Sequence, residues 1–181
     1  GRLNTKAFGP PVPVMSDPVG QWVIGIENLS AGRPGPVIAM KGEDLRRSIY
    51  VQARRSRPLS MFETFDLPRM EPLCEQRNSS TVATQSLMLM NGDFVMTQAD
   101  ACARQLQAEF QSNTDAIIVR LWELIYARQP DQSEQADTRQ FLEEQEATLA
   151  ARAGKEDQPR QQALANLCQI LLSSNEFLYL E

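Results

Sequence analysis

Five of the fifteen arginines of this chain lie in the twelve positions from Arg46 to Arg57, although its formal net charge is −5. An arginine run of this density can pair with carboxylates of the same chain, hold a sulfate or phosphate group, or bind nucleic acid. Acidic residues stand on both sides of the run, at Glu43, Asp44, Glu63 and Asp66. Because partly buried arginine is normally paired, the pattern favours an internal network of ion pairs. An anion site stays open as the alternative.

A second polar stretch, residues 74–85 (CEQRNSSTVATQ), leads directly into an expected helix. Its side chains Arg77, Asn78, Ser80 and Thr81 could bind an anion together with the free amides of the helix N-terminus. They could equally cap the start of the helix and satisfy its backbone groups, which is the commoner arrangement.

Catalysis has little support in this sequence. The chain contains no histidine, so a Ser or Thr nucleophile would need Asp, Glu or Lys as its base, and no catalytic residue is predicted. The alternative, a fragment of a hydrolase or redox-associated enzyme, would place Arg77, Asn78, Asp66 and Glu63 in a cleft that upstream domains complete. The candidate anion-binding or structural residues are therefore Arg46, Arg47, Arg55, Arg77, Asn78, Ser80, Thr81, Asp66 and Glu63.

The composition excludes several other kinds of site. Without histidine the usual zinc and haem ligands are missing, and Cys74, Cys102 and Cys168 are too far apart for a close-spaced metal motif. We therefore expect no metal and no cofactor in this chain. The negative net charge disfavours nucleic acid as a partner, and no apolar run is long enough to predict a membrane span. One disulfide among the three cysteines is allowed but not required.

Residues 1–45 are expected to form an irregular lobe. Six of the eleven prolines and seven of the nine glycines lie in residues 1–42, where runs such as GPPVP prevent regular helix. Branched and aromatic residues predict short strands at residues 21–26 and 37–40, and alternation of apolar and polar residues predicts another at 48–54. Trp22 is expected to be buried and to hold the lobe in place.

From Thr81 onward the apolar residues recur with a helical period. The pattern predicts helices at residues 81–90, 94–111 and 114–128, a fourth that opens at residues 130–134, and a fifth that begins at Pro159. Asp131 with Glu134 fits a capping box. The third helix is apolar nearly all round, so it is expected to be the central one.

These elements predict a mainly α fold, a bundle of about five helices with an irregular N-terminal lobe that carries two or three short strands. We expect the lobe, residues 1–45, to pack on a helical domain of residues 46–181 that opens with a strand, and the two to form a single structural unit. The N-terminus has neither a Met nor a signal-peptide pattern. The chain is therefore expected to be a C-terminal fragment of a longer protein.

Motifs of distinctive spacing follow one another along the chain. They are Gly9-Pro10, Gly20-x-Trp22, GEDLRRSIY at residues 42–50, Arg57-Pro58, Phe65-Asp66, CxxRNxSTxxxQxLxLxN at residues 74–91, Arg128-x-Pro130 and SNEFLY at residues 174–179. In this order they resemble the planctomycete-type (PSD-type) C-terminal domain of unknown function, over most of the chain. The motif at residues 74–91 is the most specific.

The resemblance implies a setting rather than an activity. In that family the domain follows a second uncharacterised domain, and often a c-type cytochrome domain, in large exported proteins. It implies an extracytoplasmic location, periplasmic or secreted, and a haem carried by another domain of the parent protein. We therefore expect a non-catalytic binding or interaction module, whose partner is another domain of the parent protein or an anionic, sulfated glycan.

Overall fold

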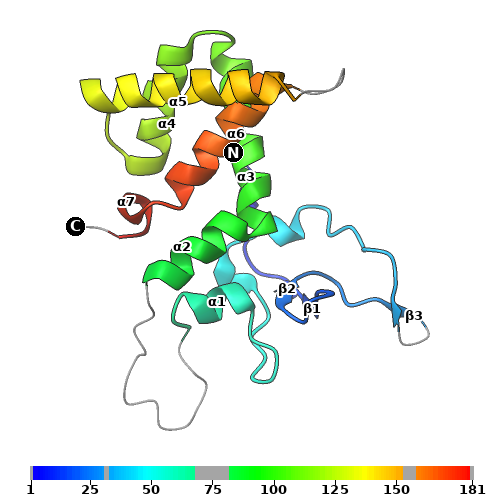
Figure 1. The fold of residues 1–181 in the computed structure, drawn as a ribbon. Helices are drawn as coiled ribbons and strands as arrows, with labels where there is room; N and C mark the ends of the chain where they lie inside the picture. Colours follow the sequence, from blue (N-terminus) through cyan, green and yellow to red (C-terminus); the bar gives the residue numbers. More distant parts are fainter. Residues whose placement is uncertain (1, 31–32, 68–81, 153–157, 180–181) are drawn as a thin grey trace. The chain divides into compact units, whose positions relative to one another are not determined.

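The computed structural model of the chain describes residues 2–30, 33–67, 82–152 and 158–179 (Figure 1). The chain divides into two compact units, Gly1–Thr81 and Val82–Glu181. Within the described residues, the first unit holds four short strands and three short helical turns, and the second holds six α-helices. Five of these helices have ten residues or more. The expected mainly α fold with short N-terminal strands is confirmed.

The first unit contains a small antiparallel hairpin, in which β1 (Val14–Ser16) pairs with β2 (Trp22–Ile24). Asp17 closes its turn, because the Asp17 carboxylate accepts hydrogen bonds from the backbone amides of Val19 at 3.0 Å and Gln21 at 2.7 Å. The strand predicted at residues 21–26 is therefore present. A second pair, β3 (Leu29–Ser30) and β4 (Arg33–Pro34), follows it.

The prediction of a strand at residues 48–54 is wrong. The first part of this segment forms a 3₁₀ turn, η2 (Ser48–Tyr50), and another 3₁₀ turn, η1 (Glu43–Leu45), precedes it. The short helix α1 (Ser60–Thr64) follows. A 3₁₀ turn has a period of three, so it ends the inward and outward alternation of a strand, and Ile49 is 83% exposed. Residues 37–40 are not a strand either, and Val37 is 87% exposed.

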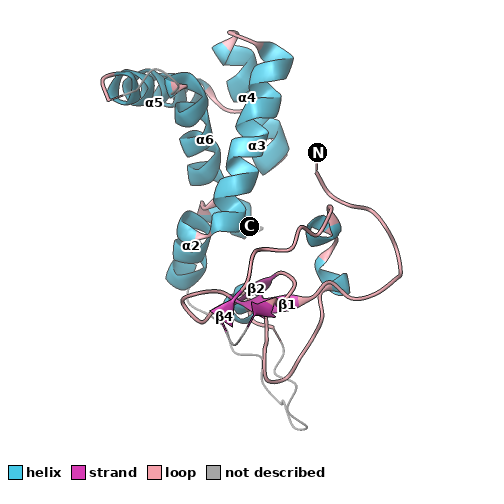
Figure 2. Cartoon of the chain, turned by 90° about the vertical axis from the view of Figure 1, so that its right-hand side faces the viewer, coloured by secondary structure: helices cyan, strands magenta, loops and turns pink. Residues whose placement is uncertain are grey.

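The second unit consists of helices that follow the sequence pattern closely (Figure 2). They are α2 (Val82–Asn91), α3 (Asp93–Phe110), α4 (Thr114–Tyr126), α5 (Gln132–Ala150), α6 (Pro159–Leu172) and α7 (Asn175–Leu178). Five of them were predicted. The sixth, α7, is a single turn of four residues, which is too short to produce a recognisable period.

Polar residues fix the points at which these helices begin. The Asn113 side chain accepts a hydrogen bond from the Ala116 amide at the start of α4, at 3.1 Å. Asp131 and Glu134 form both hydrogen bonds of the predicted capping box at the start of α5. Pro159 occupies the first turn of α6, where the missing N–H of proline removes no intrahelical bond.

The core of the second unit lies where α3 packs against α6, and Figures 1 and 2 show these two helices side by side. α6 contributes six buried residues and contacts all five other helices. The prediction that α4 would be central was therefore wrong. The side chains of this core come from α3, α4 and α6: Ala99, Ala103, Leu106, Ile117, Ile118, Leu121, Trp122, Leu164, Ala165, Leu167, Cys168 and Leu171.

The first unit extends farther along the chain than the expected lobe of residues 1–45. The Asn4 amide donates to the carbonyl of Leu45 at 2.9 Å, and the Val12 amide donates to the carbonyl of Tyr50 at 2.7 Å. The Gln52 amide returns a bond to the Val12 carbonyl at 2.8 Å. These bonds hold residues 45–52 to residues 4–12, so the arginine run from Arg46 belongs to the first unit. That the two units pack as one structural unit stays a prediction.

Candidate functional site

The Arg46 side chain is enclosed by the first unit, with no exposed surface. Its Nη2 donates to the Phe8 carbonyl at 2.6 Å, and its Nη1 donates to the Pro10 carbonyl at 2.9 Å and to Glu43 Oε2 at 3.3 Å. The guanidinium carbon lies over the Tyr50 ring, 4.1 Å from the ring centroid. These contacts connect the N-terminal segment with both 3₁₀ turns, which is a structural role.

Glu43 extends this network to Lys6. The Lys6 ammonium pairs with Glu43 Oε1 at 2.7 Å, while Arg46 takes the other oxygen. The hydrogen bond from Lys6, together with the nearby charge of Arg46, lowers the pKa of Glu43. Asn4 adds a bond from its Nδ2 to the Gly42 carbonyl at 2.9 Å. Residues 4–10 are therefore fixed along η1 by several polar side chains.

The other arginines of the run differ in their contacts. Arg57 pairs with Glu27 at 3.1 Å, and its guanidinium carbon lies 4.9 Å from the centroid of the Trp22 ring. Arg47, Arg54 and Arg55 are exposed, and their side chains form no hydrogen bond or ion pair with any residue that the structure describes. The arginine run therefore contains both internally paired and free side chains. We use the name basic segment for residues Arg46–Arg55.

Two large apolar side chains are exposed beside the basic segment or within it. Phe8, whose carbonyl accepts from Arg46, is 82% exposed, and Ile49 in η2 is 83% exposed. Phe8 has a φ of +60°, a region that costs an ordinary residue about 1 kcal/mol. Backbone strain of this kind persists where surrounding contacts enforce it and is concentrated at functional sites. The Arg46 hydrogen bond is such a contact.

The remaining predicted site residues are only partly described. Glu63 is exposed on α1, and Asp66 follows this helix with a φ of +59° and is half-buried. Arg77, Asn78, Ser80 and Thr81 lie outside the described residues. Of the enzyme cleft considered above, the structure therefore places Glu63 and Asp66 alone, the first in the last turn of α1 and the second just after this helix.

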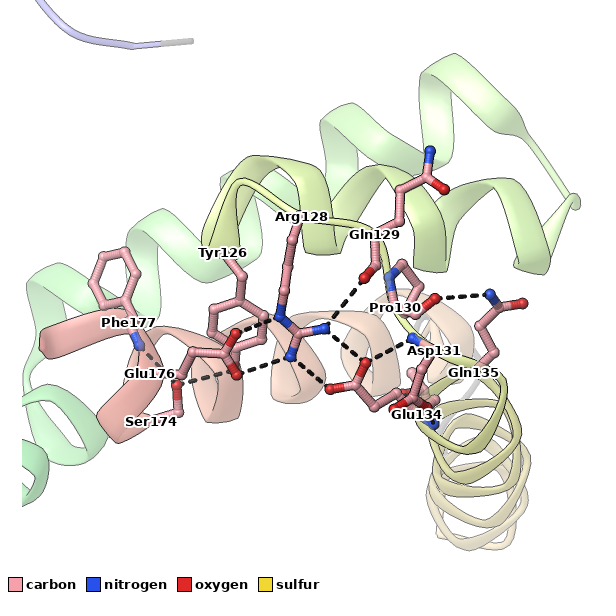
Figure 3. Close-up of polar contacts among 11 residues, drawn as sticks. Tyr126, Arg128, Gln129, Pro130, Asp131, Glu134, Gln135, Ser174, Glu176 and Phe177 are labelled. Atoms are coloured by element: carbon pink, nitrogen blue, oxygen red, sulfur yellow. Dashed lines mark hydrogen bonds and ion pairs between the residues drawn. The ribbon is translucent and has the colours of Figure 1, made fainter. Parts of the chain in front are cut away.

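A polar cluster around Arg128, at the end of α4, was missed by the sequence reasoning (Figure 3). Arg128 binds Glu134 through Nη1 at 2.8 Å and Nη2 at 2.6 Å, and it binds Glu176 through Nε at 2.6 Å and Nη2 at 3.0 Å. A fifth bond runs from Nη1 to the Gln129 carbonyl at 3.2 Å. Since a guanidinium has five N–H donors, none remains for an external ligand.

The Arg128 cluster therefore joins the end of α4 to the start of α5 and to α7. Tyr126 supports the same connection, because its hydroxyl forms a 2.9 Å hydrogen bond with Ser174 Oγ. Burial raises the pKa of Tyr126, so this hydroxyl stays protonated. A sequence signal existed, since the motifs Arg128-x-Pro130 and SNEFLY at residues 174–179 supply the two sides of the cluster.

The Arg128 cluster makes the second unit sensitive to acid. The hydrogen bond from Arg128 lowers the pKa of Glu134 from 4.5 to about 2. Because the folded pKa is depressed, the stabilisation is complete above about pH 4.5 and is lost as the pH falls toward about 2. The Glu134 side chain is 29% exposed, so solvent screening limits the effect to roughly 1–2 kcal/mol.

Thermal unfolding of the second unit from pH 5 to pH 2.5, followed by its helical circular dichroism, tests this prediction. Glu134→Gln keeps a residue compatible with the capping box but removes the titrating group, so we expect a smaller loss of stability on acidification. Glu123→Gln is the matched control, since Glu123 forms an exposed pair with Arg120 on α4. Identical pH profiles for Glu134→Gln and the wild type would contradict the prediction.

A cleft of about 490 Å³ lies at the start of α4, beside α5 and α6. Both arginines that line it are already bound to the chain: Arg139 pairs with Asp115, and Arg160 donates to the Ser112 carbonyl at 3.2 Å and to Thr114 Oγ1 at 3.1 Å. Two carboxylates, Glu143 and Glu146, also line it. Arg160 forms no ion pair with a described carboxylate, but the negative charges of Glu143 and Glu146 disfavour an anion in this cleft.

The part of the chain that the structure describes contains neither a candidate metal site nor a candidate membrane-spanning helix. No three or more His, Cys, Asp or Glu side chains gather there in a way that could hold a metal ion. None of the described helices combines the length and apolar character that crossing a bilayer requires.

The fold and these contacts define a mainly helical domain whose irregular N-terminal unit is held together by a buried arginine. The chain belongs to the family PSD1, Protein of unknown function (DUF1553), whose model matches residues 1–142. The resemblance drawn from the sequence motifs is thereby confirmed, although the motif at residues 174–179 lies beyond the matched range. No curated protein and no solved structure matches the chain significantly.

Proposed function

We propose that this chain is a non-catalytic interaction module of a larger exported protein, and that its basic segment binds an acidic surface on another domain of that protein. The exported setting rests on the family resemblance. The observation that carries the proposal is the contrast within the basic segment. Arg46 is buried and paired, whereas Arg47, Arg54 and Arg55 are exposed and have no partner among the described residues.

Charge supports an external partner for these arginines. The chain has 23 acidic residues against 18 basic ones, so internal carboxylates are plentiful, yet none within the described ranges pairs with Arg47, Arg54 or Arg55. Arginine is also the basic residue best suited to planar, bidentate binding of a carboxylate. An acidic protein surface supplies such groups.

The exposed apolar side chains favour a protein partner over a glycan. Stable protein interfaces combine aromatic and aliphatic side chains with arginine, and a few of these residues carry most of the binding energy. Phe8, whose carbonyl accepts a hydrogen bond from Arg46, and Ile49, two positions after Arg47, supply the apolar part. A sulfated glycan would use the arginines and leave Phe8 and Ile49 without a role.

Calorimetric titration of the chain with the separately produced remainder of its parent protein tests the proposal. We expect Phe8→Asn with Ile49→Ser to weaken binding about tenfold or more, and asparagine suits this position because it tolerates positive φ. The triple variant Arg47→Ala, Arg54→Ala, Arg55→Ala should also bind more weakly and with a smaller salt dependence. Val19→Ser, which changes a residue that is 79% exposed in the β1–β2 turn, is the control.

The same titration with a sulfated polysaccharide separates the two kinds of partner. Binding that the arginine triple variant abolishes, and that Phe8→Asn with Ile49→Ser leaves unchanged, would replace the protein partner with an anionic glycan. Absence of binding to both the parent remainder and the polysaccharide would contradict the interaction module itself.

A further inference from the structure

Two cysteines lie where α3 and α6 pack together in the second unit. Cys102 lies on α3 and is half-buried, and Cys168 lies on α6 and is completely buried. Cys102 packs against the buried cluster that contains Cys168, and the two thiols are close enough for each to shift the pKa of the other. Both thiols are free.

Small residues around these cysteines allow the two helices to approach closely. Ala99 and Ala103 flank Cys102 on α3, and Ala165 lies one turn before Cys168 on α6; all three alanines are buried. A disulfide needs its two Cα atoms within about 4.4–6.8 Å. The small side chains beside the two cysteines favour a close approach of α3 and α6, which pack against each other.

We propose that Cys102 and Cys168 form a redox-active dithiol, which a small disulfide such as oxidised glutathione converts into a disulfide bond between α3 and α6. This inference is independent of the proposed interaction through the basic segment. It assigns a site of covalent modification to the helical unit, and its substrate is a disulfide of low molecular weight.

The reaction proceeds by two exchanges. The Cys102 thiolate attacks one sulfur of the small disulfide, which forms a mixed disulfide and releases one small thiolate. Cys168 then loses its proton and attacks Cys102 Sγ, which forms the protein disulfide and releases the second small thiolate. Two electrons pass from the protein to the small disulfide, and the two thiol protons end on the two released thiols, so atoms and electrons balance.

The environments of the two thiols suit these separate roles. The neighbouring Cys168 thiol lowers the pKa of Cys102, which favours the thiolate form of Cys102. The neighbouring Cys102 and burial raise the pKa of Cys168. The half-buried Cys102 is the thiol that an external disulfide can reach, and Cys168 completes the exchange from within the core.

The test uses the full chain carrying Cys74→Ser, which removes the third cysteine. Incubation with a series of oxidised to reduced glutathione ratios is followed by counting free thiols and by mass spectrometry under non-reducing conditions. We expect the loss of both thiols, a mass lower by two hydrogens, a cross-linked peptide that joins α3 to α6, and a melting temperature raised by roughly 10 °C.

Two variants complete this test. Cys168→Ala, which fits a small core position, should stop at the mixed disulfide and gain the mass of one glutathione at Cys102. Cys102→Ser should keep its remaining thiol through the same incubation, since Cys168 is buried. The proposal fails if the Cys74→Ser chain itself accumulates only the mixed disulfide, or if both of its thiols stay reduced at every ratio.

Discussion

Arg46→Ala is expected to destabilise the first unit by roughly 3 kcal/mol. The substitution removes a buried guanidinium and leaves the carbonyls of Phe8 and Pro10 without their donors. It also removes the ring contact with Tyr50. Since small units have little stability to lose, residues 4–12 should detach from residues 43–52.

Amide hydrogen exchange measures this effect directly. The amides of Asn4, Val12 and Gln52 donate across the two segments, so we expect their protection to fall strongly in Arg46→Ala. Arg47→Ala is the matched control, because Arg47 is the same residue type one position later and is exposed. Unchanged protection of these three amides in Arg46→Ala would show that the buried arginine does not hold the first unit together.

Leu121→Ala should destabilise the second unit by about 3 kcal/mol, within the usual range for a leucine removed from a tight core. Leu121 on α4 is completely buried among the side chains of α3, α4 and α6. The cost combines the lost burial of the side chain with the cavity that it leaves. Leu124→Ala lies on the same helix but replaces a residue that is 50% exposed, so it should cost less than about 0.5 kcal/mol.

Urea unfolding followed by helical circular dichroism measures both leucine variants. The midpoint of Leu121→Ala should fall well below the wild type, while that of Leu124→Ala should stay close to it. Equal midpoints for the two variants would contradict the location of the core between α3, α4 and α6.

The helices could be predicted from sequence because local signals set them. The capping box of Asp131 and Glu134, the proline at residue 159 and the apolar spacing of α3 each act within a few residues. The central position of α6 could not be predicted in the same way. It depends on small side chains such as Ala165 and Cys168, which allow several neighbours to pack closely, and the apolar pattern of α4 was the stronger local signal.

The first unit was less predictable because its backbone is held by side chains from distant positions. Alternation at residues 48–54 resembled a strand, yet the segment bonds to Val12 at one isolated bridge and otherwise turns. The local sequence does not predict the positive φ of Phe8. It accompanies the hydrogen bond from Arg46 to the Phe8 carbonyl, and Arg46 lies 38 positions away.

Contacts between residues far apart in the sequence also limit how well the candidate site can be predicted. Arg46 and Arg47 are adjacent and chemically identical, and only the tertiary structure makes the first buried and the second exposed. Arg128 was missed because Glu176, one of its two carboxylate partners, lies 48 positions along the chain. Sequence composition identified arginine as the informative residue type, and the fold decides which arginines are free.

Amide hydrogen exchange, compared between this chain alone and its whole parent protein, tests whether the basic segment is the binding surface. We expect residues 6–10 and 47–55 to gain protection in the parent, because the exposed arginines, Phe8 and Ile49 are covered there by another domain. Unchanged exchange in both segments, with new protection confined to α2–α7, would contradict the role of the basic segment as the binding surface.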